Sequence, residues 1–352
     1  MKRLIAIAIL GALMLSCSPD TKKKPEEKEK KPAQTDQFTG LTERAQQLFG
    51  TLPMVAENPE NILTDEKVAL GKKLFFDVRL SKDNTISCNS CHDLKTFGVD
   101  NLSVSPGNDK GSFGTRNSPT VLNAALHFSQ FWDGRAKNVE EQAGMPILNP
   151  VEMAIPSKKF LEDRLSAIKE YQKGFAIAFP DDKNPINYNN IQNAIGAFER
   201  MLITPSPFDS FLAGNANALT NKEKAGLDKF MRTGCITCHS GKLLGGHSLL
   251  KFGSFYNYWE LTKSSTIDMG RYEVTKKEGD KYMFKIPSLR NVAQTAPYFH
   301  DGSVENLEEA VKIMAKLQVD KDLSDEDAKL IVAFLNSLTG KLPKLPETKI
   351  IE

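Results

Sequence analysis

A five-residue motif that occurs twice constrains this chain more than any other feature of its sequence. The first copy is Cys88-Asn89-Ser90-Cys91-His92, and the second is Cys235-Ile236-Thr237-Cys238-His239. Residues at i, i+3 and i+4 are neighbours on a helix surface, so the thiols and the imidazole of each copy project to one side. This spacing is typical of c-type haem attachment, in which the cysteines form thioethers and the histidine reaches the iron. The sequence therefore predicts two covalently bound haems.

Zinc binding and dithiol redox chemistry are the alternatives for a CxxC pair. Both leave His92 and His239 unexplained, and a zinc site would need the two motifs to meet. Four of the five cysteines lie in the motifs, which leaves none for a structural disulfide. A similar helical segment precedes each motif, starting at Thr64 and at Thr220, and indicates an internal duplication. Haem attachment is the favoured interpretation.

The first 17 residues resemble a bacterial export signal, with Lys2 and Arg3 before a short apolar run. That run is too short to span a membrane comfortably. The segment Leu15-Ser16-Cys17 resembles a lipobox, in which Cys17 becomes the lipidated first residue, and the alternative is an ordinary signal peptide with an incidental cysteine. Haem attachment takes place outside the cytoplasm, so we expect a periplasmic protein held to a membrane through a lipid on Cys17.

Periodicity predicts a mainly α fold, and the internal duplication indicates two related haem modules. Residues 18–40 are expected to be a disordered charged tether, because they mix both charges and have almost no apolar side chains. The remaining length suits two domains, which we place at 41–204 and 205–345, packed around an interface with long loops. The net charge of +2 gives no indication of nucleic-acid binding.

Apolar periodicity and capping residues predict the individual helices. The expected ranges are 41–49, 64–76, 157–168, 189–202, a helix after Thr220, 304–317 after Ser303, and 325–338 after Ser324. Ser118 and Pro119 fit the start of a further helix through Leu126. Residues 241–287 are rich in glycine and aromatic residues, and we expect loops and a short hairpin there.

Four longer motifs carry a resemblance to a known family. They are Phe131-Trp132-Asp133-Gly134-Arg135, Asn149-Pro150-Val151-Glu152-Met153, Pro287-Ser288-Leu289-Arg290-Asn291 and Thr295-Ala296-Pro297-Tyr298-Phe299-His300. In this order, and with both haem motifs, the chain closely resembles the bacterial di-haem cytochrome c peroxidases from about Leu52 to Gly340. The resemblance implies two cytochrome c-like haem domains packed around an interface. It also implies reduction of hydrogen peroxide to water by a homodimer that takes electrons from a small cytochrome c or a copper protein.

The resemblance assigns different roles to the two haems. The first, with proximal His92, would be the peroxidatic one, and the second, with proximal His239, would receive the electrons. From the residues alone, Met314, Met269 and Met283 are equal candidates for the second iron's other ligand, and Met314 is also explained as part of an apolar helix stripe. The resemblance selects Met314.

Further roles follow from the same resemblance. Glu152 matches the family's acid–base carboxylate, which takes a proton from peroxide and returns it to the departing oxygen. Gln142 would assist in the same pocket, and Trp132 matches the tryptophan between the haems.

A calcium ion at the domain interface is also implied by the resemblance. Asn117 would provide a side-chain oxygen, and Thr295 and Pro297 would provide backbone carbonyls, which are ligands that suit Ca²⁺. Arg290 would assist the interface, and His300 would give polar support around a haem.

One segment departs from the family. Many members carry a distal histidine in a Gly-His-Gly-type loop, where it blocks the resting peroxidatic haem, but Ser105 to Gly111 contains no histidine. His127 and His247 lie in other segments, and we expect His127 to be structural. We therefore predict that the first haem has no sixth protein ligand at rest and needs no prior reduction of the second.

Two other functions remain open. One is a di-haem oxidase of the kind that matures the tryptophylquinone cofactor of methylamine dehydrogenase, which has tyrosine at the position that matches Met314. The other is a non-enzymatic electron carrier or haem sensor, for which two six-coordinate haems are expected.

Overall fold

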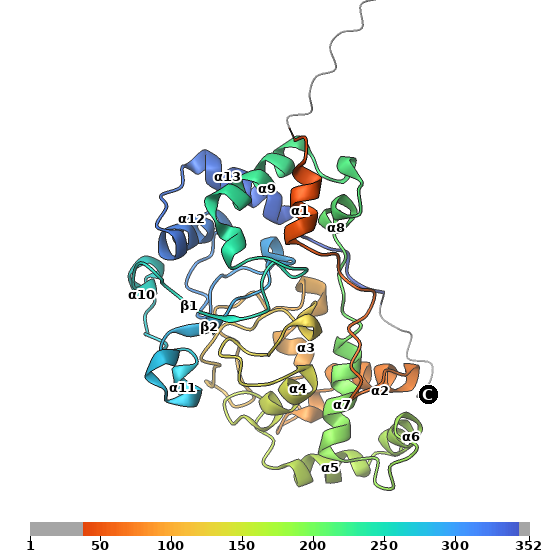
Figure 1. Cartoon of the computed structure of the whole chain (residues 1–352). Helices are drawn as coiled ribbons and strands as arrows, with labels where there is room; N and C mark the ends of the chain where they lie inside the picture. The colour runs from red at the N-terminus through yellow and green to blue at the C-terminus, as the bar shows by residue number, and fades with distance from the viewer. Residues whose placement is uncertain (1–37, 345–352) are drawn as a thin grey trace, which may run out of the picture. The chain divides into compact units, whose positions relative to one another are not determined.

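The fold is described by a computed structural model, in which residues 38–344 are placed (Figure 1). The predicted export signal, Cys17 and the tether as far as residue 37 lie outside the described residues. The described part is mainly helical, as the sequence predicted, with one small sheet. No helix within it is both long enough and apolar enough to cross a membrane.

The α-helices follow one another with long connections. They are α1 Leu41–Leu48, α2 Asp65–Phe75, α3 Cys88–Cys91, α4 Val139–Leu148, α5 Lys158–Ser166, α6 Lys169–Ala178, α7 Tyr188–Glu199, α8 Pro207–Leu212, α9 Asn221–Thr233, α10 Tyr258–Thr262, α11 Tyr272–Thr275, α12 Leu307–Val319 and α13 Asp325–Asn336. Strands β1 (Leu249–Lys251) and β2 (Met283–Lys285) pair antiparallel, with Leu249 opposite Lys285. The two strands are therefore connected by the long segment 252–282 rather than by a tight hairpin turn.

Capping side chains start several of the predicted helices. The Thr64 hydroxyl accepts a hydrogen bond from the amide of Lys67, and Thr220 forms a capping box with Glu223. The hydroxyl of Ser324 caps α13 in the same way. Each cap satisfies an amide that the first helical turn leaves without a partner.

The prediction of a helix from Ser118 to Leu126 is wrong. Only a short 3₁₀ helix, η3 (Ala124–Leu126), forms there. The Ser118 hydroxyl is hydrogen-bonded to Ser105 Oγ at 2.7 Å instead of capping a helix. Asn123 has a φ of 61°, and a residue in this left-handed conformation interrupts an α-helix.

The predicted start of α12 is also corrected. The helix begins at Leu307, and its cap is Asn306, whose side chain accepts hydrogen bonds from the amides of Glu308 and Glu309. Val304 lies outside the helix because its carbonyl accepts a hydrogen bond of 2.6 Å from the Tyr298 amide in a β-bridge.

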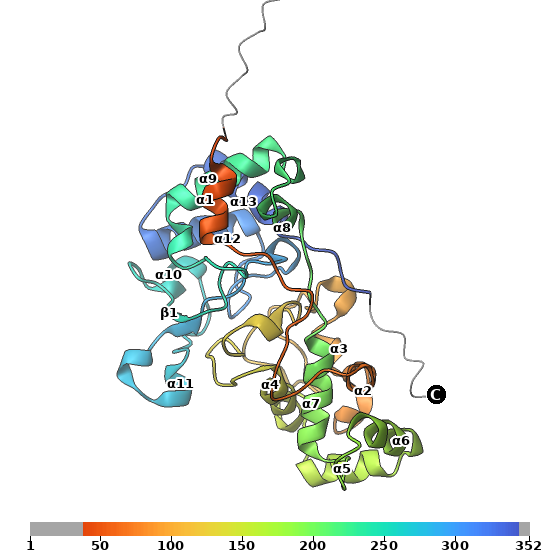
Figure 2. The same ribbon diagram turned by 45° about the vertical axis from the view of Figure 1, so that its right-hand side comes forward.

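Two large hydrophobic clusters hold the helices together. The first is built mainly from α2 and α4 to α7, and Cys88 packs against it. The second is built mainly from α1, α8, α9 and α13, and Cys235 packs against it. Figures 1 and 2 show the first group of helices below the two strands and the second group above them. Each haem motif therefore lies at the edge of its own apolar core.

The same close helix contact occurs once in each cluster. Gly71 of α2 packs against the backbone carbonyl of Ala194 in α7, and Gly226 of α9 packs in the same way against Leu330 in α13. A methyl group at either glycine would overlap the opposing carbonyl oxygen. This repeated packing agrees with the internal duplication inferred from the segments before each motif.

A second repeated feature joins the two halves of the fold. Asn123 and Asn291 both have left-handed backbones, and each precedes a 3₁₀ helix, η3 or η7 (Val292–Gln294). Their side-chain amides donate to the same hydroxyl, that of buried Thr204, at 2.8 and 2.9 Å. The Asn123 and Asn291 side-chain oxygens accept from the amides of Thr204 and Gly340. These bonds fix the segments after residues 117 and 287 relative to each other.

The glycine contacts give the first prediction. Gly226→Ala should lower the free energy of unfolding by about 1–3 kcal/mol, because the new methyl group must push α9 away from α13. Chemical denaturation followed by far-ultraviolet circular dichroism measures the change. Gly279→Ala is the control, since a methyl group there meets no atom within 4 Å, and it should change stability by less than about 0.5 kcal/mol. Equal stabilities of the two variants would contradict the close contact.

Candidate functional site

The first haem motif lies at the wall of a cavity, called here the first cavity. Cys88, Cys91 and His92 line it. A capping box between Ser87 and Ser90 starts α3, and the His92 amide donates to the Cys88 carbonyl at 3.0 Å. One helical turn therefore presents both thiols and the imidazole to the same space, as the spacing predicted.

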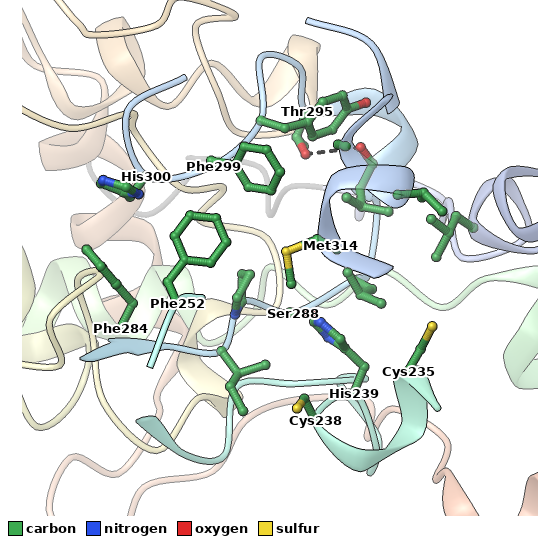
Figure 3. A pocket seen from close by; sticks show the side chains of 18 of the residues that line it. Cys235, Cys238, His239, Phe252, Phe284, Ser288, Thr295, Phe299, His300 and Met314 are labelled. Atoms are coloured by element: carbon green, nitrogen blue, oxygen red, sulfur yellow. Dashed lines mark hydrogen bonds between the residues drawn. The ribbon is translucent and has the colours of Figure 1, made fainter. Parts of the chain in front are cut away.

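The second motif lines another cavity, the second cavity, with Cys235, Cys238 and His239 (Figure 3). Nδ1 of buried His239 donates to the Leu244 carbonyl at 2.8 Å, because a carbonyl oxygen can only accept. Burial lowers the pKa of His239 to about 4, so the imidazole is neutral at pH 7. Nδ1 carries the proton, and Nε2 is left with a lone pair that faces the cavity. A neutral imidazole oriented in this way is a good iron ligand.

Met314 of α12 also lines the second cavity, and its sulfur points toward His239 across the space in Figure 3. Met269 and Met283, the other two candidates from the sequence, are not among the described residues that line this cavity. A histidine and a methionine on opposite sides fit the two axial positions of a haem iron.

The residues of the first cavity also fit a haem. His92 is partly buried, and this burial lowers its pKa, although the nearby backbone of Gly98 and of Pro119 opposes the shift. Neither backbone group completes a hydrogen bond to Nδ1, which is buried without a partner. Among the residues that the structure describes, no cluster of three or more histidine, cysteine or acidic side chains is placed to hold a metal ion. The two motifs do not converge, so the zinc alternative has no support.

Glu152 lines the first cavity and lies in the turn after α4. Its amide donates to the Asn149 carbonyl at 3.0 Å, and its carbonyl accepts from the Asn108 amide at 2.7 Å. Burial raises the pKa of the carboxyl group, while the Asn149 side chain and the charge of Arg135 oppose that shift. Gln142 of α4 lines the same cavity. The site thus holds a carboxyl group that retains its proton to a higher pH than usual.

The loop from Ser105 to Gly111 borders the first cavity where the family's distal histidine is expected. Ser105 and Pro106 line the cavity, and the Ser105 hydroxyl is hydrogen-bonded to Asp100 at 2.5 Å. Besides His92, His127 is the one histidine among the described lining residues, and its Nδ1 is 2.9 Å from Nζ of Lys285.

Trp132 lines both cavities. Its indole Nε1 donates to the Asn117 carbonyl at 2.9 Å. The next residue, Asp133, pairs with Arg116 at 2.5 Å and with Arg135 at 2.8 Å. These bonds hold the indole in the wall that the two cavities share.

The three predicted calcium ligands border the same cavity. Asn117, Thr295 and Pro297 all line the second cavity. The Asn117 amide donates to the His300 carbonyl at 2.8 Å, and its side-chain nitrogen donates to the Leu102 carbonyl at 2.9 Å. This orientation leaves the side-chain oxygen of Asn117 as an available ligand.

Arg290 and His300 lie in different surroundings. Arg290 is fully buried and pairs with Asp209 at 2.5 Å, and it is not among the described residues that line either cavity. Its contacts explain it as a structural residue. His300 lines the second cavity, with its ring 4.4 Å from that of Phe284 and 6.3 Å from that of Trp132. Its Nε2 is buried without a hydrogen-bond partner.

The sequence reasoning missed Lys285. This lysine is buried and lines both cavities. Its position between Phe284 and Ile286, both also buried, was the available signal, since lysine is rarely buried without a specific partner.

A mainly helical chain that presents two CxxCH motifs to two buried cavities has the architecture of a di-haem c-type cytochrome. A family model described as di-haem cytochrome c peroxidase matches residues 65–217. The chain is 44% identical over 311 residues to the cytochrome c551 peroxidase of Pseudomonas aeruginosa, across 88% of this chain and 89% of that protein. It is 43% identical over 300 residues to the cytochrome c551 peroxidase of Nitrosomonas europaea, across 84% and 86% of the two chains.

A solved structure of a MauG-like protein associated with microbial copper homeostasis is also similar, with a TM-score of 0.72 and 30% identity. The match covers 82% of this chain and 94% of that one. The chain therefore belongs to the di-haem cytochrome c peroxidase family. Membership confirms the predicted family and the peroxidase class of enzyme, and it implies c-type haem as the cofactor.

Proposed function

We propose that this enzyme reduces hydrogen peroxide to water in the periplasm, with electrons from a small cytochrome c or a cupredoxin. The observation that carries the proposal is the asymmetry of the two cavities. A methionine faces His239 in the second, whereas a partly buried carboxyl group, that of Glu152, and a loop without histidine border the first. Peroxide would react at the haem held by His92, and electrons would arrive at the haem held by His239 and Met314.

Each haem, when bound, supplies an iron atom that exchanges electrons and, in the first cavity, accepts peroxide. Glu152 would take the first proton from peroxide and return it to the departing oxygen. A carboxyl group whose pKa is raised by burial suits both steps, because it holds its proton more readily than a solvated carboxyl group and can still release it. Gln142 would orient the peroxide by hydrogen bonding, and Trp132 in the shared wall would lie on the electron path between the haems.

The proposal extends to the organisation of the chain. We place one haem domain at 41–204 and the other at 205–345, with a calcium ion held by Asn117, Thr295 and Pro297 between them. The N-terminal segment would carry a lipid anchor on Cys17, and the enzyme would act as a homodimer. The two repeated packing features support the two-domain organisation.

The two alternative functions predict different sites. An oxidase of the tryptophylquinone-maturing kind has tyrosine in place of Met314, and a pure electron carrier has both iron atoms fully ligated by the protein. Methionine in the second cavity argues against the first alternative, and the loop from Ser105 to Gly111 argues against the second. Steady-state reduction of peroxide with a reduced small cytochrome separates all three.

Replacement of Glu152 tests its proton transfer. Glu152→Gln should keep both haems and lower kcat by about 10²–10⁴-fold, because the amide cannot exchange a proton with peroxide. Steady-state kinetics measures the loss, and the visible spectrum checks the haem content. Glu57→Gln is the matched control, because Glu57 is exposed and lies outside both cavities. Unchanged turnover in Glu152→Gln would refute the role.

Replacement of Met314 tests the second iron's ligand. Met314→Leu should lower the midpoint potential of the second haem, because a thioether ligand raises it, and should leave the first haem unaffected. Spectroelectrochemical titration resolves the two haems. Met269→Leu and Met283→Leu are the controls, and a lowered potential in either of them, with none in Met314→Leu, would reassign the ligand.

The loop without histidine predicts an enzyme that is ready to react when fully oxidised. Mixing the all-ferric enzyme with peroxide should change the haem spectrum within the time of a stopped-flow measurement, because no imidazole has to leave the first iron. Prior reduction of the second haem should not speed the change. A spectrum that responds only after this reduction would show that another group occupies the distal side.

A further inference from the structure

Lys285 lies in the wall that the two cavities share. It lines both of them, as do His127 and Trp132. It is the last residue of β2, and its amide donates to the Trp132 carbonyl at 2.6 Å. The strand and the tryptophan segment thus hold the lysine between the two haem sites.

The ammonium group of Lys285 has only neutral partners. Nζ is 2.9 Å from Nδ1 of His127 and donates to the Ser129 carbonyl at 3.1 Å. Burial and the lysine charge lower the pKa of His127 well below its usual range, so the imidazole is a neutral acceptor. An ammonium group has three N–H donors, and these two acceptors leave the third for another partner.

Among the residues that the structure describes, no free carboxylate is hydrogen-bonded or ion-paired to this ammonium group. Asp133 is the acidic group whose charge raises the pKa of Lys285, but its side chain is already paired with Arg116 and Arg135. The effect of burial is larger than that of the Asp133 charge and lowers the pKa of Lys285 to about 7. A buried charge without a counter-ion is costly, so the protonated form of Lys285 would be stabilised by an anion beyond those that the described residues provide.

We propose that Lys285, oriented by His127, binds a haem propionate carboxylate in the wall common to both cavities and acts as a shared positive charge for the two haems. A c-type haem is attached through its vinyl groups, so its propionates remain free to pair with a cation. The spare N–H of Lys285 would donate to one propionate oxygen. The ion pair keeps the lysine protonated, and its charge favours an electron on either iron. The inference rests on the two-haem organisation proposed above.

Replacement by glutamine isolates the charge, because an amide can still donate to His127 and to the Ser129 carbonyl. In Lys285→Gln, the midpoint potentials of both haems should fall, with each reduction equilibrium weakened about tenfold, or about 59 mV for one electron. Lys285→Arg keeps the charge and should restore both potentials. Lys251→Met is the matched control, since Lys251 lies exposed on the paired strand β1, and it should change neither potential.

Two results would overturn the inference. One is a folded Lys285→Gln enzyme with both haems and unchanged potentials. The other concerns resonance Raman spectroscopy of the wild-type holoenzyme. We expect a propionate bending mode of a strongly hydrogen-bonded carboxylate that disappears in Lys285→Gln, and a mode that is the same in both enzymes would overturn the inference. If glutamine prevents haem loading, the wild-type mode decides alone, and its absence rejects the inference. Potentials and Raman modes are measured without peroxide, so failure here is distinct from failure of the proposed peroxidase reaction.

Discussion

Two asparagine amides that meet on one buried hydroxyl determine how the halves of this protein face each other. Asn123 and Asn291 both donate to Thr204, and each starts a 3₁₀ helix beside a segment that lines the cavities. A hydroxyl oxygen has two lone pairs, so Thr204 accepts both amides at once. Because Ala124 lines the first cavity and Val292 lines the second, these bonds connect the walls of the two cavities.

The chemical difference between the two cavities arises within a repeated framework. Both have a CxxCH motif on a short helical turn, a glycine contact between two helices and a left-handed asparagine. The difference lies in what faces each histidine. Helix α12 brings Met314 to the second cavity, whereas the turn after α4 brings Glu152 to the first. Duplication thus provides two similar sites, and local segments outside the repeat give them different side chains opposite the histidine, which is the basis of the two roles that we propose.

The charged side chains in the wall that the two cavities share are unevenly paired, which the hydrophobic periodicity of the sequence does not reveal. Asp133 is held between Arg116 and Arg135, while Lys285 has only the neutral His127 and a carbonyl as partners. Such an imbalance is costly in a protein interior. It is understandable in a protein whose cofactor brings its own carboxylates.

The sequence by itself determined the haem chemistry and most helices. The spacing in Cys88 to His92 and the caps at Thr64, Thr220 and Ser324 act within a few residues, and local rules therefore predict them. The helix that we predicted after Ser118 does not form. The Ser118 hydroxyl, its expected cap, is hydrogen-bonded to the Ser105 hydroxyl, which lies 13 residues earlier in the chain. The family resemblance pointed to Met314, but only the tertiary structure brought it into the same cavity as His239 and revealed Lys285, because both depend on segments more than 70 residues apart. Such distant contacts are decided by packing and by hydrogen bonds between segments.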